Sequence, residues 1–468
     1  MMPASDPSRP FPEVRTRPSF ARSSTTTAVI LFAAANLALN LGLRARGSET
    51  ALSYTRAWLQ FRGGDDSWRP MLKALHESAE PTPDWQRRDD ADSIYQRVVF
   101  RDGVKFQYPL TALTLPVLVR SVLGDVNDAA VVNALNVLSW SAIPGLLLCS
   151  TWIFGQVVDD VAPQAADTRG RRFSLVASLV VCLAGLMFYP LVYGFALGQV
   201  QTILDALFGV AVFLLLRGGT AAAGVPIGLM TLVKPQYGLL LVWAGARRRW
   251  RLVMAGGSIV LAGAALAVYR FGIAENLAYF RLARHIAQHG EAFYENQSVN
   301  GLLNRILQPA PYLGSLVGRF PPYNVTVHAG TWAIGAVIVG LALFRPGADD
   351  RHSTVLDLAI MAVSLTLASP IAWDIITASC CRCLRSCSRG SRPTRNGAGG
   401  ASNWAQRPSA TSCSRPDSTV SAGSTRVRGT CCSPTWSSEP SSCSCSCIDG
   451  TVDRQPLRRQ RADRSQRR

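Results

Sequence analysis

Apolar residues along this chain gather in long runs that alternate with short polar segments. The clearest runs are Thr27–Leu43, Ala129–Phe154, Phe173–Phe195, Leu197–Leu216, Leu252–Val268, Thr331–Phe344 and Thr354–Ala368. About 20 consecutive apolar residues cross a hydrocarbon layer roughly 30 Å thick, and shorter runs need tilt or neighbouring helices. The pattern therefore predicts an all-α membrane protein with several spans.

Two apolar stretches are too broken or too short to be simple spans. Ala221–Ala246 is interrupted at Lys234-Pro235, and proline breaks a helix because it has no amide hydrogen. We expect a helical hairpin there that enters the membrane from one side and returns to it. Tyr108–Leu123 is interpreted as a re-entrant or interfacial segment; if it crossed the membrane, the orientation of every later helix would reverse.

The arginines set an orientation for these helices. The formal net charge is +18, and 16 arginines with only five acidic residues lie from Ala378 onward. The other clusters lie between apolar runs, at Arg169–Arg172, Arg217, Arg247–Arg251 and Arg345–Arg351. Arginine-rich loops stay in the cytoplasm, so residues 1–24 are expected inside the cell, and 45–128 and 270–329 outside. This placement indicates a plasma-membrane protein surrounded by lipid and argues against a nucleic-acid partner.

Polar residues that are costly in a membrane recur near the ends of the runs. They occur in GGDDSW with Asp65 and Asp66, KFQYP with Lys105, Gln107 and Tyr108, ALGQVQ with Gln199, LVKPQYG with Lys234, NQSVNGLLNR with Asn296, Gln297, Asn300 and Arg305, and SPIAWD with Trp373 and Asp374. In the orientation above, Lys234 lies at the hairpin tip and the others at or beyond outer helix ends. Polar groups at membrane depth usually face a cavity on a substrate path. We therefore expect these polar residues to line one shared cavity that opens on the outer side of the membrane.

Each motif also has an ordinary structural interpretation. An aspartate pair in a long loop is commonly solvated surface, and Gln199 can cap a helix or bind another helix. Lys234 is harder to explain in this way, because a lysine inside an apolar segment costs roughly 3 kcal/mol unless it reaches water or an anion. Asp90-Ala-Asp92 resembles a metal-holding acid pair, but a surface position is the simpler interpretation.

Taken in this order, the motifs resemble those of glycosyltransferase family 87, the polyprenyl-phosphate-sugar-dependent, alpha-mannosyltransferase-like membrane enzymes with a GT-C fold. The matching elements are an Asp shortly after the first helix, YP entering an apolar stretch, LGQVQ opening a helix, LVKP followed by RRRWR, NQSVNGLLNR in an outer loop, and SPIAWD near a helix end. They cover about residues 25–375, which we expect to form one GT-C-like transmembrane domain. The resemblance implies hexose transfer, with mannose the first candidate, from a polyprenyl-phosphate donor to a glycolipid or polysaccharide acceptor of the cell envelope.

The resemblance also implies roles for the motif residues. Asp66, or its neighbour Asp65, would be the general base of a direct, inverting displacement. Lys234 and Arg305 are the candidates for the donor phosphate, since arginine offers two donors to its oxygens and lysine a point charge. Further substrate contacts are expected from Lys105, Gln107, Tyr108, Gln199, Asn296, Gln297 and Asn300, with Trp373 stacking on a sugar or isoprenoid face and Asp374 orienting a donor group. The lipid-linked sugar phosphate is a substrate; no cofactor or metal-ligating residue is predicted, and a divalent metal stays open.

The chain changes character after Asp374. Where family members commonly continue with two histidines and another helix, this chain reads Ile375-Ile376-Thr377. Restoring one base in front of GC-rich codons for IITASCC gives HHYGILL, a family-like continuation. We therefore interpret residues 376–468, rich in Cys, Ser and Arg, as an out-of-frame, disordered tail. Its cysteines lack a matching histidine, so a zinc site is not expected.

Two other classes of function remain open at this stage. A transporter or flippase for lipid-linked sugars would also gather polar groups around broken helices, but it should show an internal repeat, and none is visible across the runs. The third class is a non-enzymatic pseudogene product, because the chain lacks the family-like continuation after Asp374. On that ground we expect this copy to be truncated and inactive even where the family assignment holds.

Overall fold

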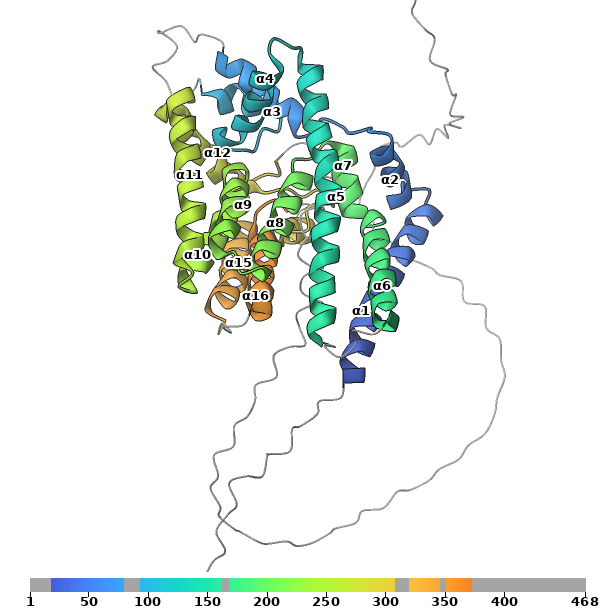
Figure 1. Cartoon of the computed structure of the whole chain (residues 1–468). Helices are drawn as coiled ribbons and strands as arrows, with labels where there is room; N and C mark the ends of the chain where they lie inside the picture. The colour runs from blue at the N-terminus through green and yellow to red at the C-terminus, as the bar shows by residue number, and fades with distance from the viewer. Residues whose placement is uncertain (1–17, 80–92, 162–167, 308–319, 346–350, 373–468) are drawn as a thin grey trace, which may run out of the picture. The chain divides into compact units, whose positions relative to one another are not determined.

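The fold is taken from a computed structural model that describes residues 18–79, 93–161, 168–307, 320–345 and 351–372. Every regular element in these ranges is helical (Figure 1). Three helices are long and apolar enough to cross a membrane, α5 (Asp128–Val161, over residues 128–156), α11 (Trp250–Phe271) and α15 (Val325–Phe344), or four if a bent pair counts as one span. The predicted all-α membrane protein is confirmed. The expectations for Asp90-Ala-Asp92, Trp373, Asp374 and the tail concern residues outside the described ranges.

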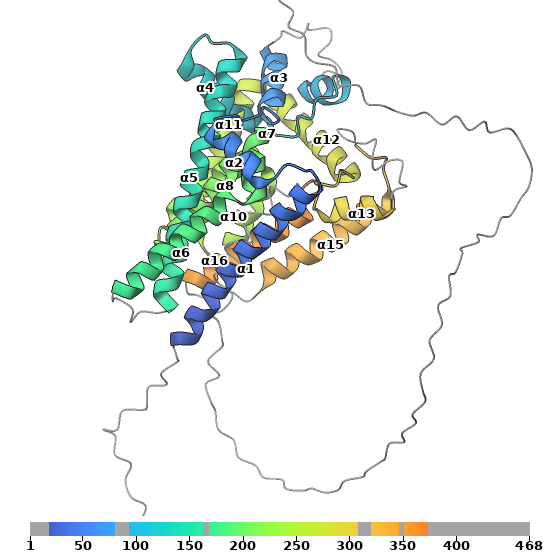
Figure 2. The same ribbon diagram turned by 90° about the vertical axis from the view of Figure 1, so that its right-hand side faces the viewer.

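The other elements follow the apolar runs and the segments between them. They are α1 (Pro18–Ala45), α2 (Ala51–Leu59), α3 (Trp68–Ala79), the π-helix η2 (Gln96–Arg101), the 3-10 helix η3 (Leu110–Leu113), α4 (Thr114–Leu123), α6 (Thr168–Leu186), α7 (Tyr189–Leu197), α8 (Gln201–Leu216), α9 (Thr220–Val233), the 3-10 turn η4 (Pro235–Tyr237), α10 (Gly238–Ala246), α12 (Ile273–His289), α13 (Val299–Leu307) and α16 (Arg351–Ala368). The segment expected as an outer loop, 270–329, thus contains α12 and α13, which lie beside α15 in Figure 2.

One apolar run is divided between two helices. The run Phe173–Phe195 is not one straight helix, because α6 ends at Leu186 and α7 begins at Tyr189 with a bend of 45°. Pro190, in the first turn of α7, suits a helix start because its missing amide hydrogen is not needed there. By contrast, the break predicted at Lys234-Pro235 is present, between α9 and η4.

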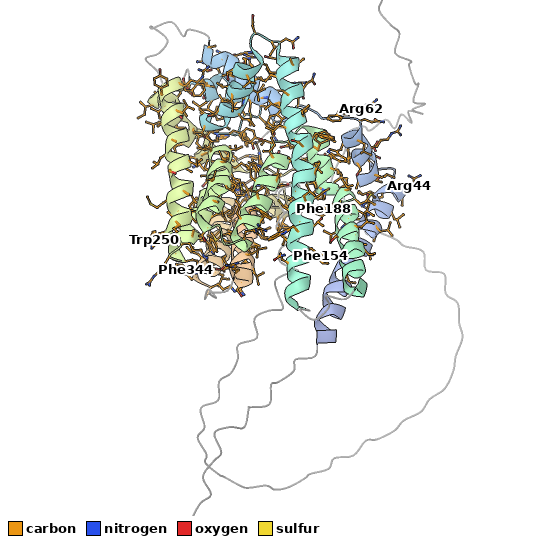
Figure 3. The ribbon with its side chains drawn as sticks, viewed as in Figure 1. Arg44, Arg62, Phe154, Phe188, Trp250 and Phe344 are labelled. Carbon is orange, nitrogen blue, oxygen red and sulfur yellow. The ribbon has the colours of Figure 1, made fainter. Side chains whose placement is uncertain are left out.

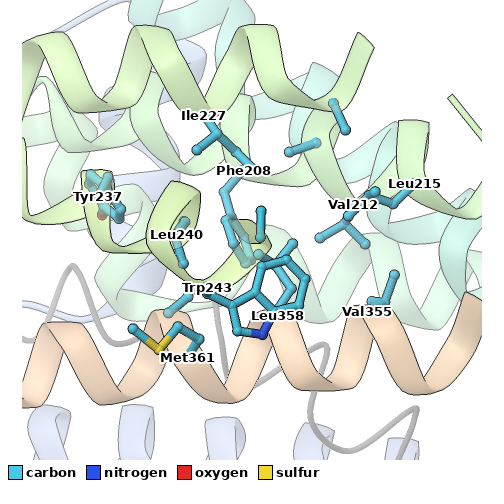
Figure 4. Packing of buried hydrophobic residues seen from close by; sticks show 14 of the residues in the cluster. Phe208, Val212, Leu215, Ile227, Tyr237, Leu240, Trp243, Val355, Leu358 and Met361 are labelled. Carbon is cyan, nitrogen blue, oxygen red and sulfur yellow. The ribbon is translucent and has the colours of Figure 1, made fainter. Parts of the chain in front are cut away.

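The membrane bundle has its apolar core between α8, α9, α10 and α16 (Figure 4). Trp243 of α10 lies fully buried in it and donates its indole N–H to Asp357 of α16, 3.1 Å away. The same carboxylate oxygen accepts from Arg247 Nε at 2.6 Å. The buried indole and the guanidinium thus share one oxygen of a buried carboxylate, which ties the hairpin to the last helix.

The first arm of the hairpin is held against α11 by backbone contact. A Cβ atom on Gly224 would lie 2.4 Å from the carbonyl oxygen of Leu252, and one on Gly228 would lie 2.6 Å from that of Gly256. These glycines are spaced as G-x-x-x-G, the pattern that lets membrane helices approach until their backbones touch. The position of α9, and of Lys234 at its end, is therefore set by close packing.

Several arginine clusters meet at one end of the bundle. Arg247 donates to the carbonyl oxygens of Leu343, at 3.0 Å, and Arg345, at 2.6 Å. Arg351 donates to that of Leu216 at 3.4 Å, next to the cluster at Arg217. Figure 3 shows Trp250 and Phe344 near this same end, where aromatic side chains commonly mark a membrane interface. Arginines from four helix ends thus form one basic rim.

A second apolar core lies away from that rim, where α3, η2, η3 and α4 pack on α5 and α12. Trp68 is fully buried there and donates its indole N–H to Asn136 of α5 at 2.9 Å. Truncating a buried Trp of this kind typically costs about 3–5 kcal/mol. Since Trp68 begins α3, its anchoring also fixes the residues just before it, which include the aspartate pair.

Candidate active site

The aspartate pair lies in a loop that runs along the segment between α7 and α8. Three backbone hydrogen bonds join them: Gly64 N to Ala196 O at 2.9 Å, Asp66 N to Leu197 O at 3.0 Å, and Ser67 N to Gly198 O at 3.1 Å. Gly198 has φ +75°, and a Cβ there would lie 2.2 Å from the carbonyl oxygen of Gly64. Both glycines are therefore required for this approach.

This pairing brings Asp66 against Gln199, and the two side chains are hydrogen-bonded, with Gln199 Nε2 donating to Asp66 Oδ2. Ser67 supports the arrangement, since its hydroxyl donates to Gln199 Oε1 at 3.2 Å and accepts from Val200 N at 3.0 Å. The Tyr108 hydroxyl lies 3.0 Å from the same serine oxygen. Residues from three motifs thus hold one carboxylate in place.

Asp66 faces a cavity of about 660 Å³. Its polar wall contains Asp66, Lys105, Gln107, Tyr108, Gln199, Gln201, Lys234 and Ser369. Its apolar wall comes largely from α12, α15 and α16, with Ile286, Trp332 and Leu365 among the lining residues. A cavity with one polar and one apolar wall suits an amphiphilic ligand.

Two lysines reach this cavity, one paired directly with a carboxylate and the other linked to one through a glutamine. Lys105 forms an ion pair with Glu291, whose side chain is almost fully buried. Lys234 donates to Gln201 Oε1 at 2.8 Å, and Gln201 Nε2 donates in turn to the buried Asp205 at 2.7 Å. Gln201 is therefore hydrogen-bonded to both Lys234 and Asp205, and these bonds fix the position of Lys234 at the cavity wall.

The environment of Asp66 favours its protonated form more than water does. The residue is open to the cavity, yet protein atoms crowd its carboxyl group, and this burial raises its pKa. The ammonium of Lys105 lowers the pKa, the charges of Asp65 and Glu291 raise it, and the hydrogen bond from Gln199 lowers it; the net direction is upward. A carboxylate with raised proton affinity is a better general base near neutral pH.

Asp65 takes a different position from its neighbour. Its carboxylate binds Arg69 through Nε at 3.0 Å and NH2 at 2.7 Å, in an exposed pair one turn apart. It does not belong to the cavity lining. An exposed pair of this kind contributes little beyond local order. The structure thus separates two residues between which sequence reasoning had only a slight preference for Asp66.

The residues expected from NQSVNGLLNR lie next to the cavity without lining it. Asn296 is fully buried; its side chain donates to the carbonyl oxygens of Glu291 and Pro370 and accepts from Ala372 N. Asn300 and Arg305 also bond within the protein, Asn300 to Thr331 and Arg305 to the carbonyl oxygens of Phe293 and Asn296, and Gln297 is exposed and bonds Tyr294 O. This motif fastens the loop carrying Glu291 to the Ser369-Pro370 segment.

Sequence reasoning did not single out Glu291, Asp205 or Ser67 as site residues. The acids lack a motif signal, since Asp205 is four residues after Gln201 inside an apolar helix and Glu291 precedes the Asn296 motif. A buried acid opposite a lysine on another element is visible only once the fold places them together. Among the described residues, no group of three or more His, Cys, Asp or Glu could hold a metal ion.

The site therefore combines a positioned carboxylate, two cationic side chains, several amides and an apolar wall. These are the groups needed to accept a proton from a hydroxyl and to stabilise a negatively charged leaving group beside a lipid tail. The groups come from seven segments of the chain. Their assembly at one cavity is a property of the fold.

Comparison with known proteins agrees with this chemistry. No curated protein and no solved structure matched the chain. The family model of glycosyltransferase family 87 matches residues 106–370, more than half of the chain. Gln107, Gln199 and Lys234 lie inside the matched range. Asp66 lies before it in the sequence and is hydrogen-bonded to Gln199 inside it. The chain belongs to glycosyltransferase family 87, a family of membrane glycosyltransferases.

Proposed function

We propose that this protein transfers a hexose, with mannose the preferred candidate, from a polyprenyl-phosphate donor to a hydroxyl of a glycolipid or polysaccharide of the cell envelope, on the outer side of the plasma membrane. The observation that carries the proposal is the shared cavity of Asp66, Lys105 and Lys234 with its apolar wall. A GT-C-like catalytic arrangement is part of the same proposal.

In this mechanism, the donor phosphate lies near Lys105 and Lys234 and its isoprenoid tail lies along the wall from α12, α15 and α16. Asp66 takes the proton of the acceptor hydroxyl while the oxygen attacks the anomeric carbon. The bond from that carbon to the phosphate oxygen breaks on the opposite side, and polyprenyl phosphate leaves with the bonding electrons. The two ammonium groups stabilise the charge that develops on the leaving group.

The roles of the surrounding residues follow from their contacts. Gln199 fixes the orientation of the Asp66 carboxylate by donating to Oδ2, which leaves Oδ1 for the acceptor proton. Glu291 holds Lys105, and Gln201 holds Lys234, so both cations are positioned before the donor arrives. Preorganised charges of this kind do not have to reorient during the reaction.

The test is transfer from radiolabelled polyprenyl-phosphate mannose in membranes that contain the protein. This copy is expected to be inactive without the family-like continuation. The assay therefore compares the chain with its present sequence and a version with one base restored before codon 375. Asp66→Asn should lower the rate by about 10²–10⁴, the usual contribution of a general base. Asp65→Asn is the matched control and should retain most of the rate. A full rate in Asp66→Asn would refute the assignment.

A further inference from the structure

Three tyrosines that the proposed mechanism does not use lie together between α2 and α7. The ring centroid of Tyr54 is 5.0 Å from that of Tyr193 and 5.6 Å from that of Tyr189, and Tyr189 and Tyr193 are 5.1 Å apart. All three side chains are partly exposed. Trp243, by contrast, is fully covered in the bundle core, so the three tyrosine rings keep surface that a ligand could contact.

A buried carboxylate lies at the edge of these rings. Glu295 is only 5% exposed, and its Oε1 accepts hydrogen bonds from the hydroxyls of Tyr193, at 2.9 Å, and Tyr294, at 3.3 Å. Both bonds go to the same oxygen. Oε2 receives no hydrogen bond from any other residue in the described ranges, so it can accept one from a ligand.

The chain connects this cluster directly to Asp66. Tyr193 lies in the last turns of α7, which lead to Leu197 and Gln199; the Leu197 carbonyl and the Gln199 side chain are hydrogen-bonded to Asp66. Tyr54 lies on α2, and the loop after α2 carries Asp66 itself. The charge of Asp66 also raises the pKa of Glu295, after the larger effect of burial, so the two carboxylates are within electrostatic reach.

An inverting displacement requires a subsite for the acceptor next to the base, separate from the donor cavity. The acceptor must approach the anomeric carbon from the side opposite the phosphate, with the base beside its hydroxyl. The donor cavity is lined by the two lysines and the apolar wall, and its lining does not include the three tyrosines. Asp66 thus lines the donor cavity and is also within electrostatic reach of Glu295, which lies at the edge of the tyrosine cluster.

We propose that Tyr54, Tyr189, Tyr193 and Glu295 form the subsite for a neutral sugar of the acceptor, with the rings covering a sugar face and Glu295 Oε2 accepting a hydroxyl proton. This inference rests on the proposed function, since it presumes that Asp66 is the base. A phosphorylated or acidic sugar is disfavoured, because its charge would face both Glu295 and Asp66.

The test measures two ligands on the full chain in lipid nanodiscs. Methyl α-mannoside, followed by saturation-transfer NMR, reports on the acceptor subsite, and farnesyl phosphate, followed by calorimetry, reports on the donor cavity. Glu295→Gln and Tyr54→Leu should weaken methyl α-mannoside binding roughly tenfold, and Tyr193→Phe by a smaller factor because the ring stays. Farnesyl phosphate affinity should not change. Tyr269→Leu, which alters a tyrosine 89% exposed on α11, is the matched control.

The outcomes separate this inference from the proposed function. Unchanged methyl α-mannoside binding in Glu295→Gln and Tyr54→Leu, or mannose 6-phosphate binding as well as the neutral glycoside, would overturn the subsite. Loss of both ligands together with a lower melting temperature in all three variants would also overturn it and leave only a structural role. If the unchanged chain bound the glycoside at the tyrosines but not farnesyl phosphate, the donor proposal would fail and the sugar subsite would stand.

Discussion

At the scale of single residues, the charges around Asp66 set the pH range in which it would act as the proposed base. A general base must be ionised, and the raised pKa of Asp66 means that its ionised form is lost on acidification at a higher pH than for an ordinary aspartate. Transfer should therefore fall as the pH drops through this raised value. The neighbours of Asp66 provide substitutions that move the value in either direction.

Lys105→Gln removes the charge that lowers the pKa of Asp66, so the acidic limb of kcat/KM against pH should move to higher pH. Asp65→Asn removes a charge that raises the pKa, and the limb should move to lower pH. The measurement is the pH profile of transfer at low donor concentration, which reports the free enzyme. Shifts in the same direction for both variants would contradict this account.

The same residues show where sequence reasoning stops. Asp65 and Asp66 are adjacent, and no periodicity in a loop tells which one faces the substrate. The decision comes from the backbone pairing with residues 196–198, which directs Asp66 to Gln199 and leaves Asp65 to Arg69. That contact spans more than 130 positions of the chain and cannot be read from either motif alone.

At the scale of elements, the approach of the Asp66 loop to the α7–α8 junction depends on Gly198. Gly198→Ala would place a Cβ in a left-handed conformation, which costs about 1–2 kcal/mol, and against the backbone of Gly64. We expect at least a tenfold loss of transfer and a lower melting temperature. Gly257→Ala is the matched control, because a Cβ there meets no atom within 4 Å. Equal behaviour of the two variants would contradict the role of this contact.

Elements were predictable where a local signal exists. The hairpin break is local, since Pro235 cannot continue a helix, and it was predicted at the right residues. The bend between α6 and α7 was missed although Pro190 lies at it, because the run was interpreted from its continuous hydropathy alone. The helices inside 270–329 were also not predicted, because hydropathy alone does not distinguish a helix from a loop in a segment that lies between two spans.

At the scale of the whole molecule, the arginine rim and the Asp66 cavity should face opposite sides of the membrane. Arg62 precedes Asp66 in its loop and Arg251 belongs to the rim cluster, and both are exposed. In a background with all cysteines changed to serine, a membrane-impermeant maleimide should label Arg62→Cys in intact cells. Arg251→Cys should be labelled only after permeabilisation. The opposite pattern would invert the orientation.

The all-α membrane class could be predicted because hydropathy acts on long stretches of chain, independently of tertiary contacts. The site could be predicted only in part. Polar residues at apolar run ends mark Gln199 and Lys234, whereas Asn296 and Asn300 carry the same signal and serve loop packing instead. A polar residue that binds substrate and one that binds backbone look alike until the fold is known.

The close contact between α9 and α11 fixes how deep in the bilayer a bound phosphate would lie. Helix α9 has 14 residues, so Lys234 lies at most about 21 Å along its axis from the arginine rim, against a hydrocarbon layer of about 30 Å. A lipid headgroup would have to sink several ångströms below its usual plane to reach this lysine. In the proposed orientation, we therefore expect donor binding to depend on membrane thickness as well as on donor chemistry.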